Sequence, residues 1–261
     1  MTSIIAQAAL APVLAQPNIR AEQVTQLVLG ETAVVLERTG DWRRVCTHLD
    51  DYGGWVHAGY ASEVEDPAVE EWRSAASGWS EGAILKVGGS QLALPLRARV
   101  ALANDSVRLP DGRRGRLIGG CVREMTDVIA ASRGKAPERW AFEHFVGSPY
   151  QWGGVTPWGV DCSGLVQTTF AARGVLLPRD SSQQVHHGTS VALSAIQPGD
   201  LLFFRSESGY AITHVAFAGE ADTLIHSTLA CGGTLAEPWL PGTRAAVLRE
   251  RLVAARRLED R

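Results

Sequence analysis

The amino-terminal part of the chain contains short stretches in which apolar and polar residues alternate, a pattern typical of half-buried strands. The stretch "TAVVLE" (32–37) alternates clearly, and "WRRVCTHL" (42–49) alternates more loosely. Each stretch is followed by turn-forming residues, Gly40-Asp41 in one case and Asp51-Tyr52-Gly53-Gly54 in the other. We therefore predict a small β-barrel over residues 1–65.

The pattern changes twice further along the chain. Residues 66–79, which include "DPAVEEWRSAASG", are predicted to be a linker or a short helix. Residues 80–125 again suggest strands, and "LPDGRRGRLIGG" repeats the turn-then-strand end of the first unit, so we predict a second, degenerate barrel there. Helical spacing of apolar residues appears from residue 126 onward, where a third domain is predicted over residues 126–261.

The stretch "DCSGLVQTTFAARG" (161–174) predicts a helix with a cysteine in its first turn. Leu165, Val166 and Phe170 repeat at helical spacing, Asp161 suits the N-cap and a glycine ends the stretch. The positive end of a helix favours a thiolate, the form of cysteine that attacks carbonyl carbon. Cys162 is thus a candidate nucleophile. Free cysteines are also often buried as small apolar residues, and the spacing alone does not decide between these alternatives.

Two histidines downstream favour the catalytic interpretation. The stretch "THVAFAGEADTLIHST" (213–228) is predicted to form a hairpin centred on residue 220, in which His214 opposes His226. A cysteine, a histidine that takes its proton and a second histidine that orients the first would form the arrangement that acyl transfer needs. The alternatives are two ordinary strand histidines or a metal site, and the second is disfavoured because no close-spaced ligand pair is present.

Composition and charge exclude several classes of function. A net charge of -3 without a basic run gives no footprint for nucleic acid, so we expect a small substrate. No apolar run is long enough to span a membrane, and the segment "SIIAQAALAPVLA" (3–15) lacks a positively charged residue before it. We therefore expect a cytoplasmic protein. The four cysteines lack the spacing of a zinc site, and free thiols are expected.

The carboxy-terminal domain resembles the NlpC-type papain-like cysteine peptidases. The resemblance rests on "SPYQWGG", "VDCSGLVQ", "LPRDSSQQ", "QPGDLLFF", "THVAFAG" and "LIHST", in that order. It implies an α+β papain-like catalytic domain, with Cys162 as nucleophile, His214 as base and His226 as the third member. It also implies that Tyr150 helps the backbone N–H of Cys162 to stabilise the oxyanion; the alternative is a packed aromatic side chain.

The run "LVLGETAVVLERTGDWRRVCTHLDDYGGWVHAGYAS" resembles the bacterial SH3-like domain, so two small all-β SH3-like barrels are expected ahead of the peptidase. That combination resembles the γ-D-glutamyl-L-diamino acid endopeptidases of peptidoglycan recycling, whose substrate is a murein peptide with a free amino-terminal L-alanine. Asp180 is then implied to bind the ammonium group. Other residues implied by this resemblance are Ser181 at the amino end of the substrate, Asp161 and Ser163 at its D-glutamyl part, and Tyr52 and Trp55 in the wall of the cleft.

Several alternatives to these roles stay open at this point. Asp161 and Asp180 could be plain helix N-caps, and Trp55 could be a core residue of a small barrel. The whole chain could be a secreted lytic endopeptidase acting on intact peptidoglycan, or a non-catalytic peptidoglycan-binding protein. No metal or organic cofactor is expected. The sequence decides neither the oligomeric state nor whether diaminopimelate or lysine follows the D-glutamate.

Overall fold

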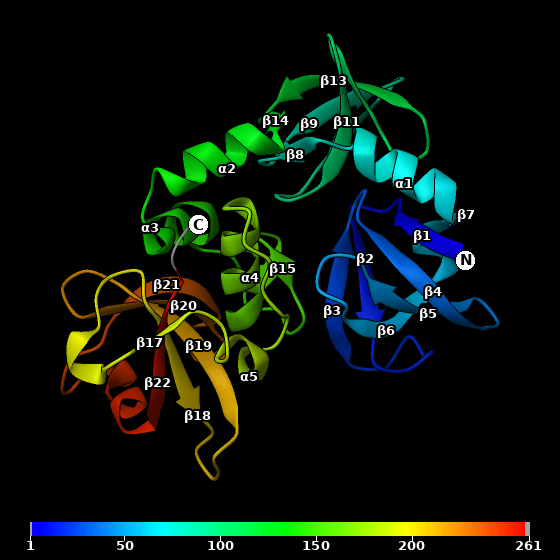
Figure 1. Ribbon diagram of the computed structural model, residues 1–261. Helices are drawn as coiled ribbons and strands as arrows, with labels where there is room; N and C mark the ends of the chain where they lie inside the picture. Colours follow the sequence, from blue (N-terminus) through cyan, green and yellow to red (C-terminus); the bar gives the residue numbers. More distant parts are fainter. Residues whose placement is uncertain (1, 259–261) are drawn as a thin grey trace. The chain divides into compact units, whose positions relative to one another are not determined.

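The first half of the chain builds two antiparallel sheets. The computed structural model describes residues 2–258 and divides into two compact units, one ending at Val128 and the other starting at Ile129. The first sheet has the order β3-β2-β6-β5-β4-β1-β7 (Figure 1). Its strands are β1 (Thr2–Ala6), β2 (Leu10–Leu14), β3 (Gln23–Val28), β4 (Thr32–Thr39), β5 (Trp42–Thr47), β6 (Gly53–His57) and β7 (Ala61–Glu65), with a 3-10 turn, η1, at Ala58–Tyr60.

The apolar segment near the amino terminus belongs to the core of this first sheet. Residues 3–15 supply most of β1 and all of β2. Four of their buried side chains join those of other strands in one cluster, made of Ile4, Ala6, Ala11, Val13, Leu27, Ala33, Val45 and Val56. The side chain of Ile5 belongs to a second cluster, with Val69 and Trp72. Among the described residues 2–258, no helix is both long enough and apolar enough to cross a membrane.

A helix and a second sheet complete the first unit. Helix α1 (Asp66–Ala75) begins at a proline-containing first turn and buries Val69 and Trp72, so it occupies the segment predicted as a linker or short helix. The second sheet has the order β10-β9-β13-β12-β11-β8-β14 and begins at Gly78. Its strands are β8 (Gly78–Ser80), β9 (Ile84–Val87), β10 (Ser90–Ala93), β11 (Arg99–Ala103), β12 (Ser106–Arg108), β13 (Arg114–Gly119) and β14 (Val122–Glu124).

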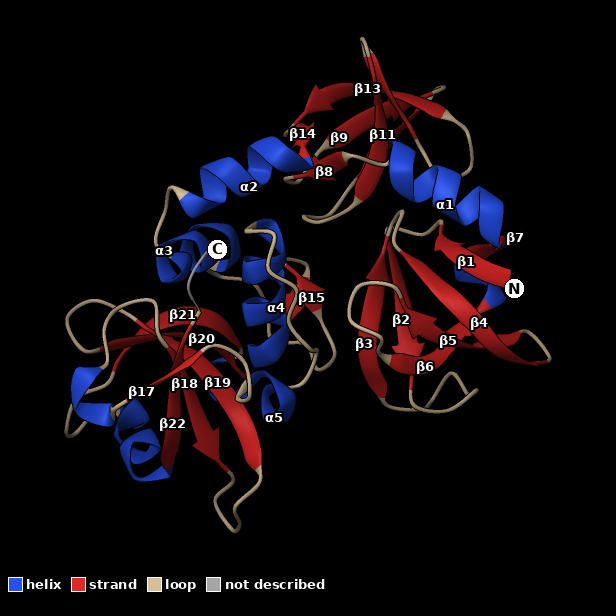
Figure 2. Ribbon diagram, viewed as in Figure 1, coloured by secondary structure: helices blue, strands red, loops and turns tan. Residues whose placement is uncertain are grey.

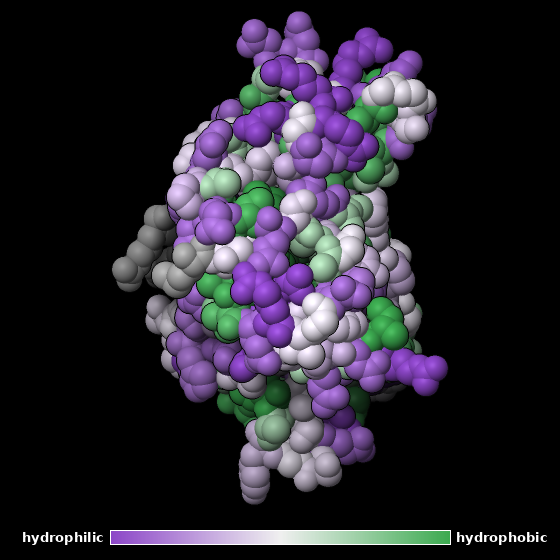
Figure 3. All heavy atoms as spheres, turned by 90° about the vertical axis from the view of Figure 1, so that its right-hand side faces the viewer, coloured by the Kyte–Doolittle hydropathy of each residue, from purple (hydrophilic) through white to green (hydrophobic). Residues whose placement is uncertain are grey.

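Exposed charged side chains cover part of the second sheet. Arg114 and Arg116 on β13 are exposed, and Arg116 pairs across the ladder with the exposed Lys86 of β9. The space-filling view shows hydrophilic residues gathered over this sheet (Figure 3). Strands therefore alternate buried and solvated positions here, as β9 does from Ile84 to Val87.

The second unit combines helices with a six-stranded antiparallel sheet of order β17-β22-β18-β19-β20-β21 (Figure 2). The strands are β17 (Thr189–Val191), β18 (Leu201–Arg205), β19 (Ile212–Ala218), β20 (Thr223–Thr228), β21 (Gly233–Pro238) and β22 (Leu252–Arg257), and a separate pair is β15 (Val155–Thr156) with β16 (Gly159–Val160). Helix α2 (Met125–Arg133) spans the boundary between the two units along the chain. The helices that lie wholly in the second unit are α3 (Pro137–Phe145), α4 (Cys162–Ala172) and α5 (Ser181–Gln184), and the 3-10 segments are η2 (Leu193–Ala195), η3 (Leu229–Cys231) and η4 (Arg244–Arg251). Two all-β sheets followed by a mixed unit confirm the predicted fold class.

Helix α4 is the central element of this unit. Every one of its residues is buried, and Phe170 stacks on Phe217 of β19 with ring centroids 6.0 Å apart. A helix buried on all sides must satisfy its polar groups internally, and Thr168 does so by donating from its hydroxyl to the carbonyl oxygen of Val155 at 2.7 Å. The helix is thereby held fixed between the sheet and the β15–β16 pair.

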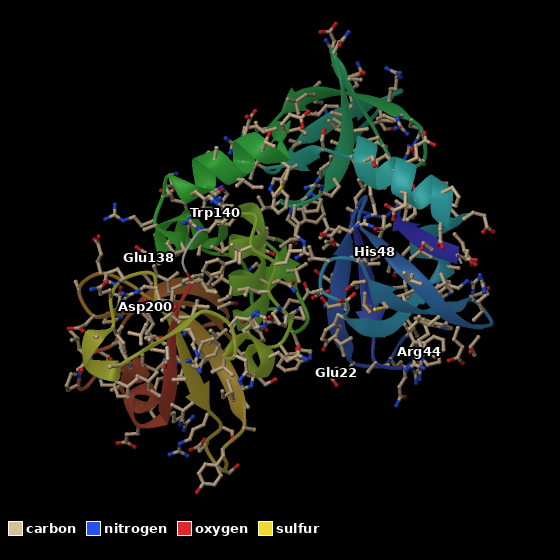
Figure 4. The ribbon with its side chains drawn as sticks, in the orientation of Figure 1. Glu22, Arg44, His48, Glu138, Trp140 and Asp200 are labelled. Carbon is tan, nitrogen blue, oxygen red and sulfur yellow. The ribbon has the colours of Figure 1, made fainter. Side chains whose placement is uncertain are left out.

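Buried polar and aromatic side chains secure the rest of the unit. Trp140 and Glu138 come from α3, and Asp200 comes from the turn before β18 (Figure 4). The carboxylate of Asp200 pairs with Arg257 of β22 at 2.7 Å and accepts from the backbone N–H of Gln197 at 2.8 Å. This pair joins the β18 turn to the last strand of the sheet.

The β19–β20 hairpin has a different register from the predicted one. Ala218 pairs with Leu224, whereas a hairpin centred on residue 220 would pair it with Asp222, so the prediction was wrong by two residues. The turn is wider because Ala221 and Asp222 both adopt left-handed backbone angles, with φ of 51° and 53°. A shift of two residues leaves each side chain on its original face, whereas a shift of one would reverse it. His214 and His226 therefore still share one face.

Candidate active site

Cys162 is the first residue of α4. Its side chain is buried, and Asp161 at the N-cap accepts a hydrogen bond from the backbone N–H of Gly164 at 2.7 Å. The sulfur receives hydrogen bonds from the backbone N–H groups of Ser163 and of Val215 on β19. The thiol thus points toward the strand position immediately after His214.

His214 and His226 contact each other directly. Nε2 of His214 lies 2.9 Å from Nδ1 of His226, and the ring centroids are 5.1 Å apart. The two residues are diagonal neighbours across the β19–β20 ladder, within reach of side chains as long as histidine. Because this contact uses Nε2 of His214, Nδ1 is the ring nitrogen available for the thiol.

Two further residues extend the chain of contacts, and the sequence analysis missed both. Nε2 of His226 lies 3.1 Å from Oε2 of Glu237 on β21, and Arg244 of η4 forms an ion pair with that same oxygen. Glu237 is 6% exposed and His226 is 1% exposed. The site therefore holds a line of two imidazoles, a carboxylate and a guanidinium, and the thiol of Cys162 contacts the strand at Val215, the residue after His214.

The protonation of the thiol and the imidazoles differs from the expected thiolate. Burial raises the pKa of Cys162 to about 12, the nearby charge of Asp161 adds to this effect, and the hydrogen bond from Val215 only partly offsets it. Burial lowers the pKa of His214 to about 3 and that of His226 to about 4. Desolvation thus opposes the expected resting thiolate and acts against the positive end of the helix. The direction of these shifts favours a neutral thiol and neutral imidazoles in the resting site.

Asp161 is bound within the protein on both carboxylate oxygens. Besides the N-cap bond, the carboxylate accepts from the backbone N–H of Gly153 at 2.8 Å and from Arg179 at 2.5 and 3.0 Å. Arg179 also donates to the hydroxyl of Ser163 at 2.8 Å, and that hydroxyl donates to Asp161 at 3.2 Å. The structure therefore supports the N-cap alternative for Asp161. The contacts predicted from Asp161 and Ser163 to the substrate stay a prediction.

Arg179 was not identified from the sequence, although it lies within the stretch "LPRDSSQQ". It is 1% exposed, so the guanidinium is removed from water, and it forms an ion pair with the carboxylate of Asp161. Burying a charge of this kind without a partner is strongly unfavourable, which indicates that the pair is a built part of the site.

Asp180 and Ser181 follow Arg179 directly along the chain. Asp180 occupies the N-cap position of α5, but its side chain makes no capping hydrogen bond, so the capping alternative is not realised by its carboxylate. Ser181 is buried, with 8% of its surface exposed. Because Arg179 binds the residues on both sides of Cys162, Asp180 and Ser181 are held near Cys162.

Tyr150 is held in the loop before α4. Its backbone N–H donates to the carbonyl oxygen of Gly232 at 2.8 Å, and it bridges to Val160. Burial raises the pKa of Tyr150 to about 12, and a charge on Cys162 is the second cause. The phenol therefore lies near the sulfur and stays protonated, as a hydrogen-bond donor must.

The loop carrying Tyr150 packs closely on the first turn of α4. A Cβ atom at position 164 would lie 2.1 Å from the carbonyl oxygen of Gly154, so Gly164 is required for this approach. This contact explains the glycine after "CS". The two glycines of "QWGG" have other causes, because a Cβ atom at Gly154 would lie 2.3 Å from the carbonyl oxygen of Gly159 and Gly153 has a left-handed φ of 74°.

Tyr52 and Trp55 belong to the first unit. Both side chains are partly exposed, and Trp55 lines a surface pocket on the first sheet together with Leu36 and Arg44. Trp55 is absent from the core cluster of that sheet, which speaks against the core-residue alternative. Their predicted place in the wall of the substrate cleft stays a prediction.

Comparison with known proteins agrees with these features. Residues 147–238 match the NlpC/P60 family, and residues 13–59 match the bacterial dipeptidyl-peptidase SH3 domain. The predicted family resemblance is thereby confirmed for both parts of the chain.

Similar proteins of known name cover most of the chain. A Bacillus cereus protein named γ-D-glutamyl-L-lysine dipeptidyl-peptidase is 29% identical over 230 residues, covering 78% of this chain and 66% of that protein. A Bacillus subtilis protein of the same name is 28% identical over 225 residues, covering 78% and 71%. This chain thus spans about two thirds of the length of these relatives.

The crystal structure of an NlpC/P60 family protein from Bacillus cereus has a TM-score of 0.79 to this chain. The two are 23% identical, and the alignment covers 98% of this chain and 99% of the other. At this identity the likeness establishes the fold.

Proposed function

We propose that this chain cleaves the γ-D-glutamyl-L-diamino acid bond of short murein peptides with a free amino-terminal L-alanine. The chain is a cysteine peptidase for cell-wall peptides, with an NlpC/P60 domain that follows a bacterial SH3 domain. The observation that carries the proposal is the contact between His214 and His226 beside the thiol of Cys162. The names of the two Bacillus relatives support the choice of bond.

The mechanism begins with a proton transfer between neutral groups. The proton of the Cys162 thiol passes to Nδ1 of His214 as the sulfur attacks the γ-carbonyl carbon of the D-glutamyl residue. His214 then donates this proton to the amine of the departing diamino acid, and the C–N bond breaks to leave a thioester. Water attacks the thioester with His214 as base, which releases the dipeptide and restores the thiol.

The oxyanion formed in each step needs donors in place beforehand. The backbone N–H of Cys162 in the first turn of α4 is one, and the half-buried phenol of Tyr150 is the second. The N–H group belongs to α4 itself, and the loop that carries Tyr150 packs on the first turn of α4. Both donors are therefore oriented before the substrate binds.

The substrate's ammonium group is assigned to Asp180, with Ser181 beside it. Asp161 is paired with Arg179, and Asp180 is the next residue along the chain, close enough for its charge to act on the same guanidinium. A cation at the amino end of the substrate is therefore assigned to the carboxylate of Asp180. A carboxylate in a closed site favours a ligand that brings a positive charge and disfavours one that lacks it.

The test of this proposal compares L-Ala-γ-D-Glu-diamino acid with its N-acetylated form. We expect wild type to cleave the free-amine peptide with kcat/KM at least ~10²-fold higher, and Asp180→Asn to lose a similar factor on that peptide, since removing one partner of a desolvated ion pair costs roughly 2–5 kcal/mol. Hydrolysis rates with lysine and with diaminopimelate peptides would also identify the preferred diamino acid.

A matched control is Asp105→Asn, which removes an exposed carboxylate from the loop between β11 and β12 and should leave both rates unchanged. Equal cleavage of the free and acetylated peptides by wild type would contradict the assignment of Asp180. It would favour the alternative of an endopeptidase that acts on larger peptidoglycan fragments. The cytoplasmic location stays a prediction.

The neutral resting site predicts a particular pH dependence. Since burial lowers the pKa of His214 from its ordinary 6.5 to about 3, the imidazole stays unprotonated as the pH falls through 6.5, and kcat/KM should hold nearly constant from pH 7 to pH 5. Since burial raises the pKa of Cys162, alkylation of the free enzyme by iodoacetamide at pH 5 should be slow.

Both measurements need circular dichroism at each pH, because buried neutral histidines lower the stability of the fold as the pH falls below their unfolded pKa. Rapid alkylation of Cys162 at pH 5 in folded protein would show a thiolate–imidazolium pair instead. A kcat/KM that halves near pH 6.5 would likewise contradict the neutral site.

A further inference from the structure

We propose that Glu237 is a positioning residue that sets the tautomers of both His226 and His214, and that Arg244 holds Glu237 in place for this role. The inference deepens the proposed function, on which it rests, because it concerns the base of that same reaction. It extends the site beyond the thiol and the two imidazoles to a carboxylate on β21 and a guanidinium on η4.

The contacts form one continuous line. His214 Nε2 lies 2.9 Å from His226 Nδ1, and His226 Nε2 lies 3.1 Å from Glu237 Oε2. Arg244 contacts the same oxygen of Glu237. His226 and Glu237 are both buried, so no bulk water competes for these hydrogen bonds.

The carboxylate of Glu237, at the end of this line, determines which ring nitrogen of each histidine carries a proton. A carboxylate can only accept, so Nε2 of His226 must carry the proton that it donates to Glu237. A neutral imidazole has one N–H, and Nδ1 of His226 must therefore accept from Nε2 of His214. Nδ1 of His214 is then left with a lone pair, which is what a base for the Cys162 thiol requires.

Arg244 acts on this line in two ways. Its guanidinium only donates, so it keeps Oε2 of Glu237 as an acceptor on the side of His226. Burial is the largest cause of the lowered pKa of both histidines, and the positive charge of Arg244 lowers both values further. For His214 the charge of His226 also lowers the pKa, more than Arg244 does, whereas the charge of Asp161 raises it. Arg244 thus helps to keep the imidazoles neutral.

The experiment compares Glu237→Leu with Glu237→Gln. Leucine removes the acceptor, whereas glutamine can place its amide oxygen at the position of Oε2 and accept from both His226 and Arg244. We expect Glu237→Leu to lower kcat by about 10²-fold with KM changed less than about threefold, and Glu237→Gln to stay within about tenfold of wild type.

The decisive readout is the tautomer of His214 in the free enzyme, from its ¹⁵N chemical shifts. Wild type and Glu237→Gln should show a proton on Nε2 only, and Glu237→Leu should show a mixture of both tautomers. Arg244→Gln, which changes a partly exposed side chain, should move the acid limb of kcat/KM to higher pH. Glu250→Gln alters an exposed carboxylate on η4 and serves as the matched control.

A wild-type tautomer at His214 in folded Glu237→Leu would overturn the inference, as would equal loss of kcat in the leucine and glutamine variants. The tautomer measurement needs no substrate. If wild type failed to cleave the tripeptide while the tautomer still changed in Glu237→Leu, the proposed substrate would be wrong and the role of Glu237 would stand.

Discussion

Replacing Cys162 with alanine is expected to lower kcat/KM on the tripeptide by about 10⁵-fold or more, because the covalent route is then closed and only binding and the oxyanion donors are left. The fold should persist. Alanine is a good helix former at the first position of α4, and the capping bond from Gly164 to Asp161 does not involve the thiol. Hydrolysis rates and thermal unfolding of the same preparation measure both effects.

Cys121→Ala is the matched control, because this partly exposed cysteine belongs to the first unit, whereas Cys162 and the two histidines belong to the second. It should hydrolyse the peptide at the wild-type rate. Full activity in folded Cys162→Ala would remove the thiol from the reaction and would support the alternative of a non-catalytic protein that binds peptidoglycan.

Local sequence patterns were enough to predict the element that carries the nucleophile. Asp161 caps α4 as expected, the helix begins at Cys162, and Gly174 has the left-handed φ of 74° that suits its position just after the helix. Each of these features is decided by residues within one or two helical turns. Such short-range preferences can be read from sequence because they do not depend on the remainder of the fold.

The histidine pair was predicted correctly for a less secure reason. The turn residues did not reveal that Ala221 and Asp222 would both adopt left-handed angles, so the hairpin was predicted in the wrong register. The error was an even number of residues, and the twofold period of a strand preserved the shared face of His214 and His226. An error of one residue would have separated them.

Residues outside these local patterns were missed because their partners lie far away along the chain. Arg179 binds Asp161, which lies 18 residues earlier in the sequence. Glu237 contacts His226 because β20 and β21 pair, and the residues of the turn between these strands do not predict the register of that pairing. The effect of burial on Cys162 was missed for a related reason. A helix terminus is a local property, whereas the burial that raises the pKa of this thiol comes from the whole unit.

Replacing Arg179 with methionine is expected to destabilise the second unit by about 3–5 kcal/mol, because Asp161 would then keep a buried charge without its cation. The same change should reduce kcat/KM by on the order of 10²-fold, since Arg179 orients both Asp161 and Ser163 around the nucleophile and its charge favours the thiolate formed during attack. Urea unfolding followed by tryptophan fluorescence, together with peptide hydrolysis, provides the two measurements.

Two comparisons make this expectation specific. Arg139→Met breaks the exposed ion pair with Glu220, and it should leave the stability of the fold almost unchanged, because exposed pairs are screened by water. Adding Asp161→Asn to Arg179→Met removes the uncompensated charge, so part of the lost stability should return although the N-cap carboxylate is gone. If Arg179→Met were no more damaging than Arg139→Met, the buried pair would contribute nothing to the fold, and the position of Ser163 beside the nucleophile would need another cause.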